Sequence, residues 1–435
     1  MLTLGQKIKA IRKEQGLTQA ELVEDRITRN QLSLIENGIN NPSISTLEFI
    51  AQRLNVPMSY FLSNDDFSFH KCQRLVAKAE SLHENEDHNA VVTEIEYFLH
   101  SISDQDNNTM GDFLGCLYAL LGIAYWKLKR TEAKDTLLTA VKYLSKSDQT
   151  SYLCKSYYYL GIIFNEENDI IQSEHYLSTA YNLISNVNLE NVILKLDIAY
   201  SLIHIYFKQE RFTEIIVFIN ENLKYSKMYK IFHNFGKFNM LISIAYLYNY
   251  NYKQAILCTL KAIEYFQFSE DEVSKYASYT NLGIFYRLSS DYENALKYLD
   301  MSRKYFEYTE NFSRALNAKA ETVKTMFLAD KQGEGFNKLL NEVIVDLDDK
   351  DENKADVLAI KGSCLLEENE IDAAINLFSK AESLVKKPAA SQFIVYAYIG
   401  LSKIYKRNQE WEKAYKYLDM ANALPHKAVK NISFE

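Results

Sequence analysis

Proline and glycine are scarce in this sequence, whose 435 residues contain only 4 prolines and 13 glycines. Few residues can therefore interrupt a helix, because proline breaks helix interiors and glycine weakens them. A chain of this length is also too long for a single hydrophobic core. Aromatic residues are common, with 32 Tyr and 23 Phe, which suits many helix pairs that each need a large side chain between them. The sequence predicts long helices with short connections, in several domains or in a repeat array.

Cysteine is also scarce and scattered. The five cysteines form no CxxC pair, so neither a disulfide framework nor a zinc site is predicted, and we expect them to be reduced and buried. His83, Glu84 and His88 are similar to the HExxH zinc motif. On one helix, however, their five-residue spacing would turn the second histidine about 140° away from the first. We therefore predict no metal site.

Long apolar runs and catalytic motifs are lacking. No uninterrupted apolar stretch reaches the length of a membrane-spanning helix, and the start MLTLGQKIKAIRKEQG lacks the apolar segment of a signal peptide. We expect a cytoplasmic protein with no membrane partner. Without a GxGxxG, Walker or nucleophile-elbow motif, we expect no enzyme activity and no cofactor. The formal net charge of −8 means that any binding to nucleic acid must be local.

Five short helices are predicted in the first sixty-odd residues, from apolar spacing and from the residues that start and stop helices. They are residues 4–15 before Gly16, a helix capped by Thr18 with Glu21, residues 29–36 between Thr28 and Asn37-Gly38, a helix capped by Ser45, and a helix from Pro57 to about Leu62.

The segments LTQAELVED, ITRNQLSLIENG and NPSISTLEFIAQRLNVPMSYFL follow one another in this part of the chain. Together they resemble the phage-repressor type of helix-turn-helix domain, the Xre or Cro/CI family, over residues 3–62 without a gap. The resemblance implies that the third helix enters the major groove of double-stranded DNA while the second helix braces on the backbone. It also implies a buried ion pair between Arg12 and Glu36.

The resemblance also implies the DNA-contacting residues. Arg29, Asn30 and Ser33 would face bases, Leu34 would make an apolar base contact, and Gln19 would bond a phosphate. The full set is Gln19, Thr28, Arg29, Asn30, Ser33, Leu34 and Asn37. Arginine pairs well with guanine and asparagine with adenine, although a merely solvated helix face is the alternative. Residues 1–66 hold seven Lys or Arg and eight Asp or Glu, so we expect a homodimer that reads two half-sites.

From about residue 70 onward one pattern recurs roughly every forty residues: glycine or a small residue, an aromatic, then an aromatic and an alanine before a second helix. Copies contain Gly122 and Tyr125; Gly161 and Phe164; Tyr246, Tyr252 and Ala255; Gly283, Tyr286, Tyr292 and Ala295; and Tyr405, Trp411 and Ala414. This is a tetratricopeptide-like signature with a longer period. We predict an all-α protein in which about nine helix pairs form a right-handed solenoid, with first helices lining a concave groove.

A repressor-type helix-turn-helix followed by such a solenoid resembles the peptide-pheromone-sensing regulators of Gram-positive bacteria, the Rap, Rgg, NprR, PlcR and PrgX group, and the longer NprR-like members most. The resemblance implies a DNA-binding domain at residues 1–64, a linker at 65–72, and a repeat domain at 73–435 for peptide sensing and dimerisation. It implies quorum sensing through a short signalling peptide.

In that group, asparagines on the inner helices hold the peptide backbone, and Asn281 stands two residues before Gly283 where such an amide commonly lies. One amide can donate to a carbonyl and accept from an N–H, so it can hold a peptide whatever its side chains. An exposed polar residue without a ligand is the alternative. Leu120, Leu241 and Ile360 fall at the equivalent site in other repeats, which confines the expected site to the middle repeats. Other inner-face candidates are Lys155, Tyr159, Asp197, Ser201, Lys237 and Lys319.

The predicted function is transcription regulation in which peptide binding alters the arrangement of the dimer and its binding to the operator. Two alternatives stay open. The solenoid could be a Rap-like module that binds a phosphorelay protein, or it could be purely structural and serve only to dimerise the regulator.

Overall fold

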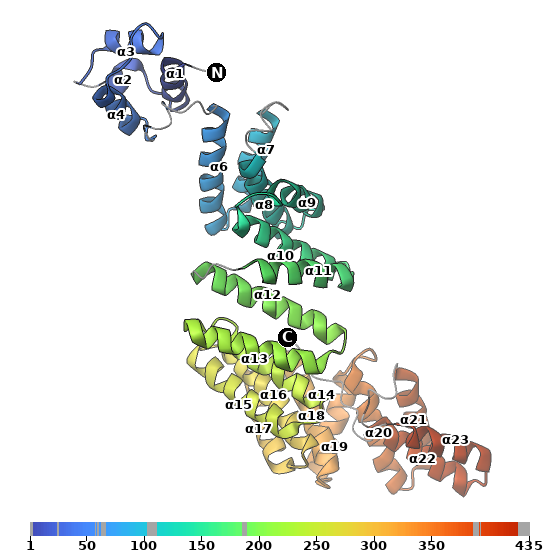
Figure 1. Ribbon diagram of the computed structural model, residues 1–435. Helices are drawn as coiled ribbons and strands as arrows, with labels where there is room; N and C mark the ends of the chain where they lie inside the picture. The colour runs from blue at the N-terminus through green and yellow to red at the C-terminus, as the bar shows by residue number, and fades with distance from the viewer. Residues whose placement is uncertain are drawn as a thin grey trace. The chain divides into compact units, whose positions relative to one another are not determined.

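The computed structural model describes residues 3–23, 26–56, 58, 61, 67–101, 111–184, 189–385, 391 and 393–424. Within these residues every regular element is a helix, so the all-α prediction is confirmed. Four short helices come first: α1 (Leu4–Glu14), α2 (Gln19–Val23), α3 (Arg29–Glu36) and α4 (Ile44–Arg53). Nine pairs of longer helices follow in the described part of the chain (Figure 1).

The starts of the first helices follow from local side-chain chemistry. Thr28 and Gln31 form a capping box, in which the Gln31 N–H donates to the Thr28 hydroxyl at 3.2 Å and the Thr28 N–H donates to Gln31 Oε1 at 2.9 Å. Thr18 and Glu21 do the same at the start of α2. Gly38 adopts a φ of +72°, the left-handed conformation expected at the end of α3.

The expected cap of α4 was wrong. Ser43, not Ser45, accepts the hydrogen bond from the Thr46 N–H at 3.2 Å, because Ser43 has the extended backbone of a cap residue and the helix already begins at Ile44. The predicted fifth helix lies largely outside the described residues, of which only Met58 and Phe61 fall within it.

The first four helices close around one apolar cluster. Ile8 and Ile11 of α1 lie in it with Leu32 and Ile35 of α3. Helix α1 approaches α3 so closely at Gly5 that a Cβ there would lie 1.9 Å from the Ile35 carbonyl oxygen. A residue without a side chain therefore fixes the distance between the first and third helices.

The described part of the chain forms nine helix pairs, which confirms the predicted repeat and the predicted number of about nine pairs. They are α6 (Phe67–Glu84) with α7 (His88–Ser101), α8 (Gly111–Lys127) with α9 (Ala133–Leu144), α10 (Thr150–Glu166) with α11 (Ile170–Leu183), α12 (Leu189–Lys208) with α13 (Phe212–Tyr229), α14 (Phe235–Tyr248) with α15 (Tyr252–Phe268), α16 (Glu272–Leu288) with α17 (Tyr292–Tyr308), α18 (Phe312–Leu328) with α19 (Glu334–Asp346), α20 (Glu352–Glu367) with α21 (Ile371–Leu384), and α22 (Ile394–Arg407) with α23 (Trp411–Asn422). Helix α6 starts inside the segment 65–72 that was expected to be a linker.

The chain forms two compact units, Met1–Asn191 and Val192–Glu435. Within both units the repeat glycines let the two helices of a pair touch. A Cβ on Gly161 or on Gly283 would lie 2.6 Å from the Leu177 or the Leu299 side chain, which explains the glycine in the repeat pattern. In the second unit the first helices of successive pairs also pack together, α16 on α18 and α18 on α20.

Candidate DNA-binding surface and inner-helix residues

Helix α3 divides into a buried face and an exposed face. Leu32 and Ile35 enter the apolar cluster, while Arg29 and Asn30 at its first turn are exposed. Ser33 and Leu34 are half-buried. The first turn thus presents a guanidinium and an amide, the two side chains best suited to reading guanine and adenine.

The position of α3 is fixed by the Arg12–Glu36 ion pair that the resemblance implies. Arg12 Nε and Nη2 donate to the two Glu36 carboxylate oxygens at 2.6 and 2.9 Å, and both side chains are buried. The third Arg12 nitrogen, Nη1, donates to the Leu17 carbonyl oxygen at 2.8 Å. The Glu36 carboxylate raises the pKa of Arg12. A single arginine therefore joins α1, the following turn and the end of α3.

Gln19 belongs to the same network. Its Nε2 donates to Glu36 Oε2 at 2.8 Å, so this nitrogen is engaged inside the domain. The phosphate contact that the resemblance implies for Gln19 would have to use its other amide atom or its backbone. Thr28 and Asn37 are exposed at the two ends of α3.

Lys9 is a residue of this surface that sequence reasoning missed. Its Nζ donates to Asn37 Oδ1 at 3.4 Å, across 28 positions of the chain. A lysine on α1 therefore places a positive charge beside the end of α3. No local pattern signals this, because the contact depends on how α1 and α3 pack.

All seven residues expected to contact a peptide lie on first helices of their pairs. In the first unit, Lys155 and Tyr159 lie half-buried on α10. Lys155 Nζ lies 5.9 Å from the centre of the Tyr152 ring, and the Tyr159 ring centre lies 5.0 Å from that of Trp126. In the second unit, Asp197 and Ser201 lie on α12, Lys237 on α14, Asn281 on α16 and Lys319 on α18.

Asp197 is the centre of a polar cluster on α12. Its Oδ1 lies 2.6 Å from His233 Nε2 and accepts a hydrogen bond from Asn234 Nδ2 at 2.8 Å. Ser201 Oγ donates to the Asp197 backbone carbonyl at 3.1 Å. The structure thus brings Asp197 together with His233 and Asn234, two residues of the loop before α14. Sequence reasoning missed them because it compared only first helices with one another.

Lys237 lies near the same cluster. Its Nζ is 5.3 Å from the centre of the Tyr200 ring, and that ring lies 4.6 Å from the His204 ring. Burial, followed by the charges of Lys208 and Lys237, lowers the pKa of His204. Asp197, Ser201 and Lys237 therefore form one polar surface on α12 and α14, with aromatic side chains among them.

Asn281 lies deeper than expected for an exposed helix residue, since only 4% of it is exposed. Leu120, Leu241 and Ile360, at the equivalent site of other repeats, are also buried. Within the described residues the Asn281 amide has no hydrogen-bond partner, and its polar atoms still reach the surface. Buried amides are nearly always hydrogen-bonded, so this group has unused capacity to bind.

Lys319 is already paired. Its Nζ lies 3.2 Å from Glu307 Oε1 and 2.5 Å from Glu342 Oε1. The hydrogen bond to Glu342, outweighing the effect of burial, raises the pKa of Lys319. This lysine therefore links α18 to the second helices α17 and α19, and its charge is balanced within the repeat.

A chain of buried charges, which we call the charge chain, joins three first helices: Arg287 on α16, Glu321 and Lys324 on α18, and Asp356 on α20. Arg287 Nη2 lies 2.8 Å from Glu321 Oε2, and Lys324 Nζ lies 2.9 Å from both Glu321 Oε1 and Asp356 Oδ2. Lys324 also donates to Asn353 Oδ1 at 2.6 Å. All four charges are buried and their signs alternate.

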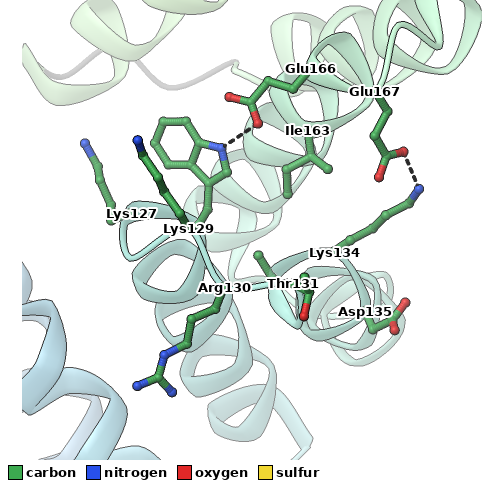
Figure 2. Close-up of a pocket in the computed structure, with 11 residues that line it drawn as sticks. Lys127, Lys129, Arg130, Thr131, Lys134, Asp135, Ile163, Glu166 and Glu167 are labelled. Carbon is green, nitrogen blue, oxygen red and sulfur yellow. Dashed lines mark hydrogen bonds and ion pairs between the residues drawn. The ribbon is translucent and has the colours of Figure 1, made fainter.

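A cavity of about 740 Å³ opens in the first unit beside the turn from α8 to α9 (Figure 2). Polar contacts across the cavity join its walls: Trp126 Nε1 donates to Glu166 Oε2 at 3.3 Å, and Lys134 Nζ lies 2.6 Å from Glu167 Oε2. None of the expected peptide contacts lines it. Tyr159 contacts its wall at Trp126.

The described part of the chain shows neither a metal-binding cluster nor a membrane-spanning helix. No group of three or more His, Cys, Asp or Glu side chains there could hold a metal ion. None of the helices described is both long enough and apolar enough to span a bilayer. All five cysteines are buried and none forms a disulfide, as expected, and burial raises the pKa of Cys72 to about 12.

The expected placement of His83 and His88 on one helix, about 140° apart, was wrong. Helix α6 ends at Glu84 and α7 begins at His88, so the two histidines do not share a helix. The turn brings their Nδ1 atoms to 3.1 Å and their ring centres to 4.9 Å.

The fold and the exposed first turn of α3 define the class of protein: a helix-turn-helix domain joined to an array of helical repeats. The helix-turn-helix family model matches residues 8–61. An immunity repressor protein of Bacillus phage phi105 is 45% identical over 65 residues, which are 15% of this chain and 45% of the repressor. The match thus spans less than half the length of that relative.

The repeat array has known structural counterparts. The apo form of RapI superimposes with a TM-score of 0.58 and 15% identity, over 81% of this chain and 96% of RapI. The apo form of the quorum sensor NprR from B. thuringiensis gives a TM-score of 0.54 and 14% identity, over 81% of this chain and 98% of NprR. These likenesses establish the fold of the helical repeats.

Proposed function

We propose that this protein is a sequence-specific DNA-binding transcription regulator whose repeat domain binds a short peptide, and that the peptide alters operator binding. The observation that carries the DNA-binding part is the exposed first turn of α3, with Arg29 and Asn30, on a helix fixed by the buried Arg12–Glu36 pair. The match of the helix-turn-helix family model to residues 8–61 and the similarity of 65 residues of this chain to a phage repressor support it.

Selection of bound duplexes from a random DNA pool, using the full chain, tests this proposal. We expect an enriched sequence, and we expect Arg29→Ala to weaken binding to it by about 5- to 150-fold, since one good base contact contributes ~1–3 kcal/mol. Arg74→Ala, which removes an exposed arginine from α6, is the matched control and should bind normally. Failure to enrich any sequence would contradict the proposal.

The peptide-binding part of the proposal is supported by Asn281. Its amide is nearly buried and has no hydrogen-bond partner in the described residues, and the polar surface of Asp197, Ser201 and Lys237 lies on the first helices of neighbouring pairs in the same unit. A peptide backbone would supply the carbonyl and N–H that such an amide can pair with. Comparable amides have other partners here, as at Asn239, whose Nδ2 donates to the Phe235 carbonyl at 2.8 Å.

Selection from a pool of short peptides of random sequence, again with the full chain, tests this part. We expect bound peptides to be lost on Asn281→Leu, because leucine fills the same site in other repeats and should preserve the fold. Asn239→Leu is the matched control for loss of a buried amide and should retain binding. Operator affinity measured with and without a selected peptide then shows whether the two activities are linked. Equal affinities would contradict the proposal that the peptide alters operator binding.

The dimeric state belongs to the same proposal. Residues 1–66 are close to electrically neutral, with seven basic and eight acidic side chains, so one domain gains little from attraction to phosphates. Two domains reading two half-sites would offset this. The alternative of a protein-interaction module without DNA binding gives no role to the exposed Arg29 and Asn30.

A further inference from the structure

Exposed apolar side chains recur along one edge of the second unit, at the four junctions that follow α13, α15, α17 and α19. Met228, Phe268, Tyr308 and Val345 occupy the last turns of α13, α15, α17 and α19, and they are 73%, 86%, 87% and 80% exposed. Their spacing is close to the repeat period. Three further exposed side chains lie just across the junctions: Phe232, Val273 and Phe312. We call these seven residues the edge ladder.

Contacts near the junctions join the helices that carry the edge ladder. The Tyr265 hydroxyl at the end of α15 donates to the Phe232 carbonyl at 2.6 Å. The Tyr276 and Tyr305 rings, on α16 and α17, stack with centres 4.0 Å apart. Lys319 contacts both Glu307 and Glu342, near the ends of α17 and α19. Helices α13 to α19 lie in sequence along the second unit (Figure 1).

The four junctions of the edge ladder are consecutive. Among the described residues of the first unit, the last turn of α9 has half-buried Tyr143 and buried Leu144, and the last turn of α11 has half-buried Leu183, whereas Tyr97 of α7 and Leu189 at the start of α12 are exposed singly. Exposed apolar residues that lie singly on a surface need no explanation, but a contiguous set marks an interaction site. Exposed apolar side chains at four consecutive junctions therefore indicate a surface that another molecule covers.

Opposite charges flank the two ends of the edge ladder. Near Met228, the exposed lysines of α13 and the turn after it are Lys224, Lys227 and Lys230. Near Val345, exposed acids outnumber exposed bases: Asp346, Asp348, Asp349 and Asp351 lie there with Lys350, and Asp349 is paired with Lys380 at 3.2 Å. The two middle junctions, from α15 to α16 and from α17 to α18, carry charged side chains of both signs. Such a surface is complementary to itself when it is turned end for end, and repels itself when it is aligned in the same direction.

We propose that the edge ladder is the contact surface between two copies of this chain, related by a two-fold axis and running antiparallel. The end of α13 in one copy then faces the end of α19 in the other, so that lysines of one copy lie opposite aspartates of the other. The apolar residues of the edge ladder pack between these two ends. A stable interface buries about 800 Å² on each partner, and covered aromatic side chains account for about 150–250 Å² each. The seven residues of the edge ladder supply part of this area, and the charged turns beside them supply the rest.

The inference deepens the proposed dimeric regulator by naming its dimer contact. It has a test of its own, because mass in solution does not depend on DNA. Sedimentation equilibrium of the full chain should show a dimer. Phe268→Ser with Tyr308→Ser should weaken the dimer at least tenfold, and both side chains are exposed, so the fold should persist. Ile171→Ser, at an apolar residue of the first unit that is 78% exposed, is the matched control and should leave the dimer unchanged.

Charge reversal tests the antiparallel arrangement. Lys224→Glu alone and Asp346→Lys alone should each dissociate, because each variant places like charges at both ends of its dimer. An equimolar mixture of the two variants should associate again, since in the mixed dimer every contact joins opposite charges. A monomeric wild-type chain, an unchanged dimer in the serine variant, or a mixture that stays monomeric would overturn the inference.

The outcome can be separated from that of the proposed function. A duplex that contains a single half-site selected by the wild-type chain reports on α3 alone. If the serine variant is monomeric yet binds this half-site normally, the dimer contact is supported. If the wild-type chain selects no DNA at all but forms a dimer that the variants disrupt, the regulator proposal fails while the edge-ladder contact stands.

Discussion

Arg12 and Glu36 form a buried, two-pronged ion pair that connects the first and third helices of the N-terminal domain, with nitrogen–oxygen distances of 2.6 and 2.9 Å. Neither residue is positioned to read a base. Their role is to fix the helix that presents Arg29.

Loss of this ion pair should unfold the N-terminal domain, and not merely reduce its stability slightly. Arg12→Ala leaves the Glu36 carboxylate buried with the Gln19 amide as its side-chain donor, and loss of one partner of a buried pair costs about 3–5 kcal/mol. Amide hydrogen exchange of residues 4–54 in the full chain measures the effect. Arg12→Leu combined with Glu36→Leu should be less harmful than Arg12→Ala alone, and the opposite order would contradict this account.

Gly5→Ala should displace α3 from α1. The added Cβ would lie 1.9 Å from the Ile35 carbonyl oxygen, and a backbone atom cannot move aside as a flexible side chain would. We expect a loss of about 1–3 kcal/mol of stability, together with weaker DNA binding. Gly335→Ala in α19 is the matched control, because nothing lies within 4 Å of a Cβ built there. That variant should be neutral or slightly stabilising.

The charge chain predicts how the second unit responds to pH. Burial tends to raise the pKa of Glu321, but Lys324 and Arg287 outweigh it and the pKa of Glu321 is lowered. Burial likewise tends to lower the pKa of Lys324, but Asp356 and Glu321 raise it. The carboxylate contributes stability above its unfolded pKa of 4.5 and loses it as the pH falls. Lys324 contributes stability below its unfolded pKa of 10.5, and this stability is lost as the pH rises through its raised pKa in the folded state.

Urea denaturation monitored across this pH range should therefore show a plateau with falling stability on both sides. Glu321→Gln should lower the plateau by about 3–5 kcal/mol, because two buried cations lose a partner, and should also flatten the acid side. Glu214→Gln, at an exposed carboxylate of α13, should change the plateau little. An acid side as steep in Glu321→Gln as in the wild-type chain would contradict the assignment.

His83 predicts a separate acid sensitivity of the first unit. Burial, then the charges of His88, Lys155 and Lys127, lowers the pKa of His83 from 6.5 to about 4. Because the folded state binds this proton less readily, its contribution to stability is complete above pH 6.5 and is lost as the pH falls toward 4. Nuclear magnetic resonance titration of the ring should show the low pKa. His83→Gln should remove that part of the pH dependence, whereas His100→Gln, at an exposed histidine of α7, should leave it.

Local patterns sufficed for much of this fold. Thr28 and Gly38 correctly bounded α3, because caps depend on residues three or four positions apart. The repeat glycines correctly marked the helix pairs. The Arg12–Glu36 contact followed only from family resemblance, and the position of the α4 cap was missed by two residues.

The site residues were harder to predict, because their partners are distant in sequence. Asp197 meets His233 across 36 positions, and Lys324 meets Asp356 across 32. Such contacts arise from the stacking of neighbouring pairs, which no single repeat encodes. For the same reason Asn281 could be placed on an inner helix, but not at a buried site without a partner.

The charge chain also restricts how the second unit can deform. Sliding α16 past α18, or α18 past α20, would pull unlike charges apart where little water can screen them. We therefore expect α16, α18 and α20 to move together as one rigid group. A bend of this unit would have to take place before α16 or beyond α20, and Asn281 lies on α16, the first helix of this stiff segment.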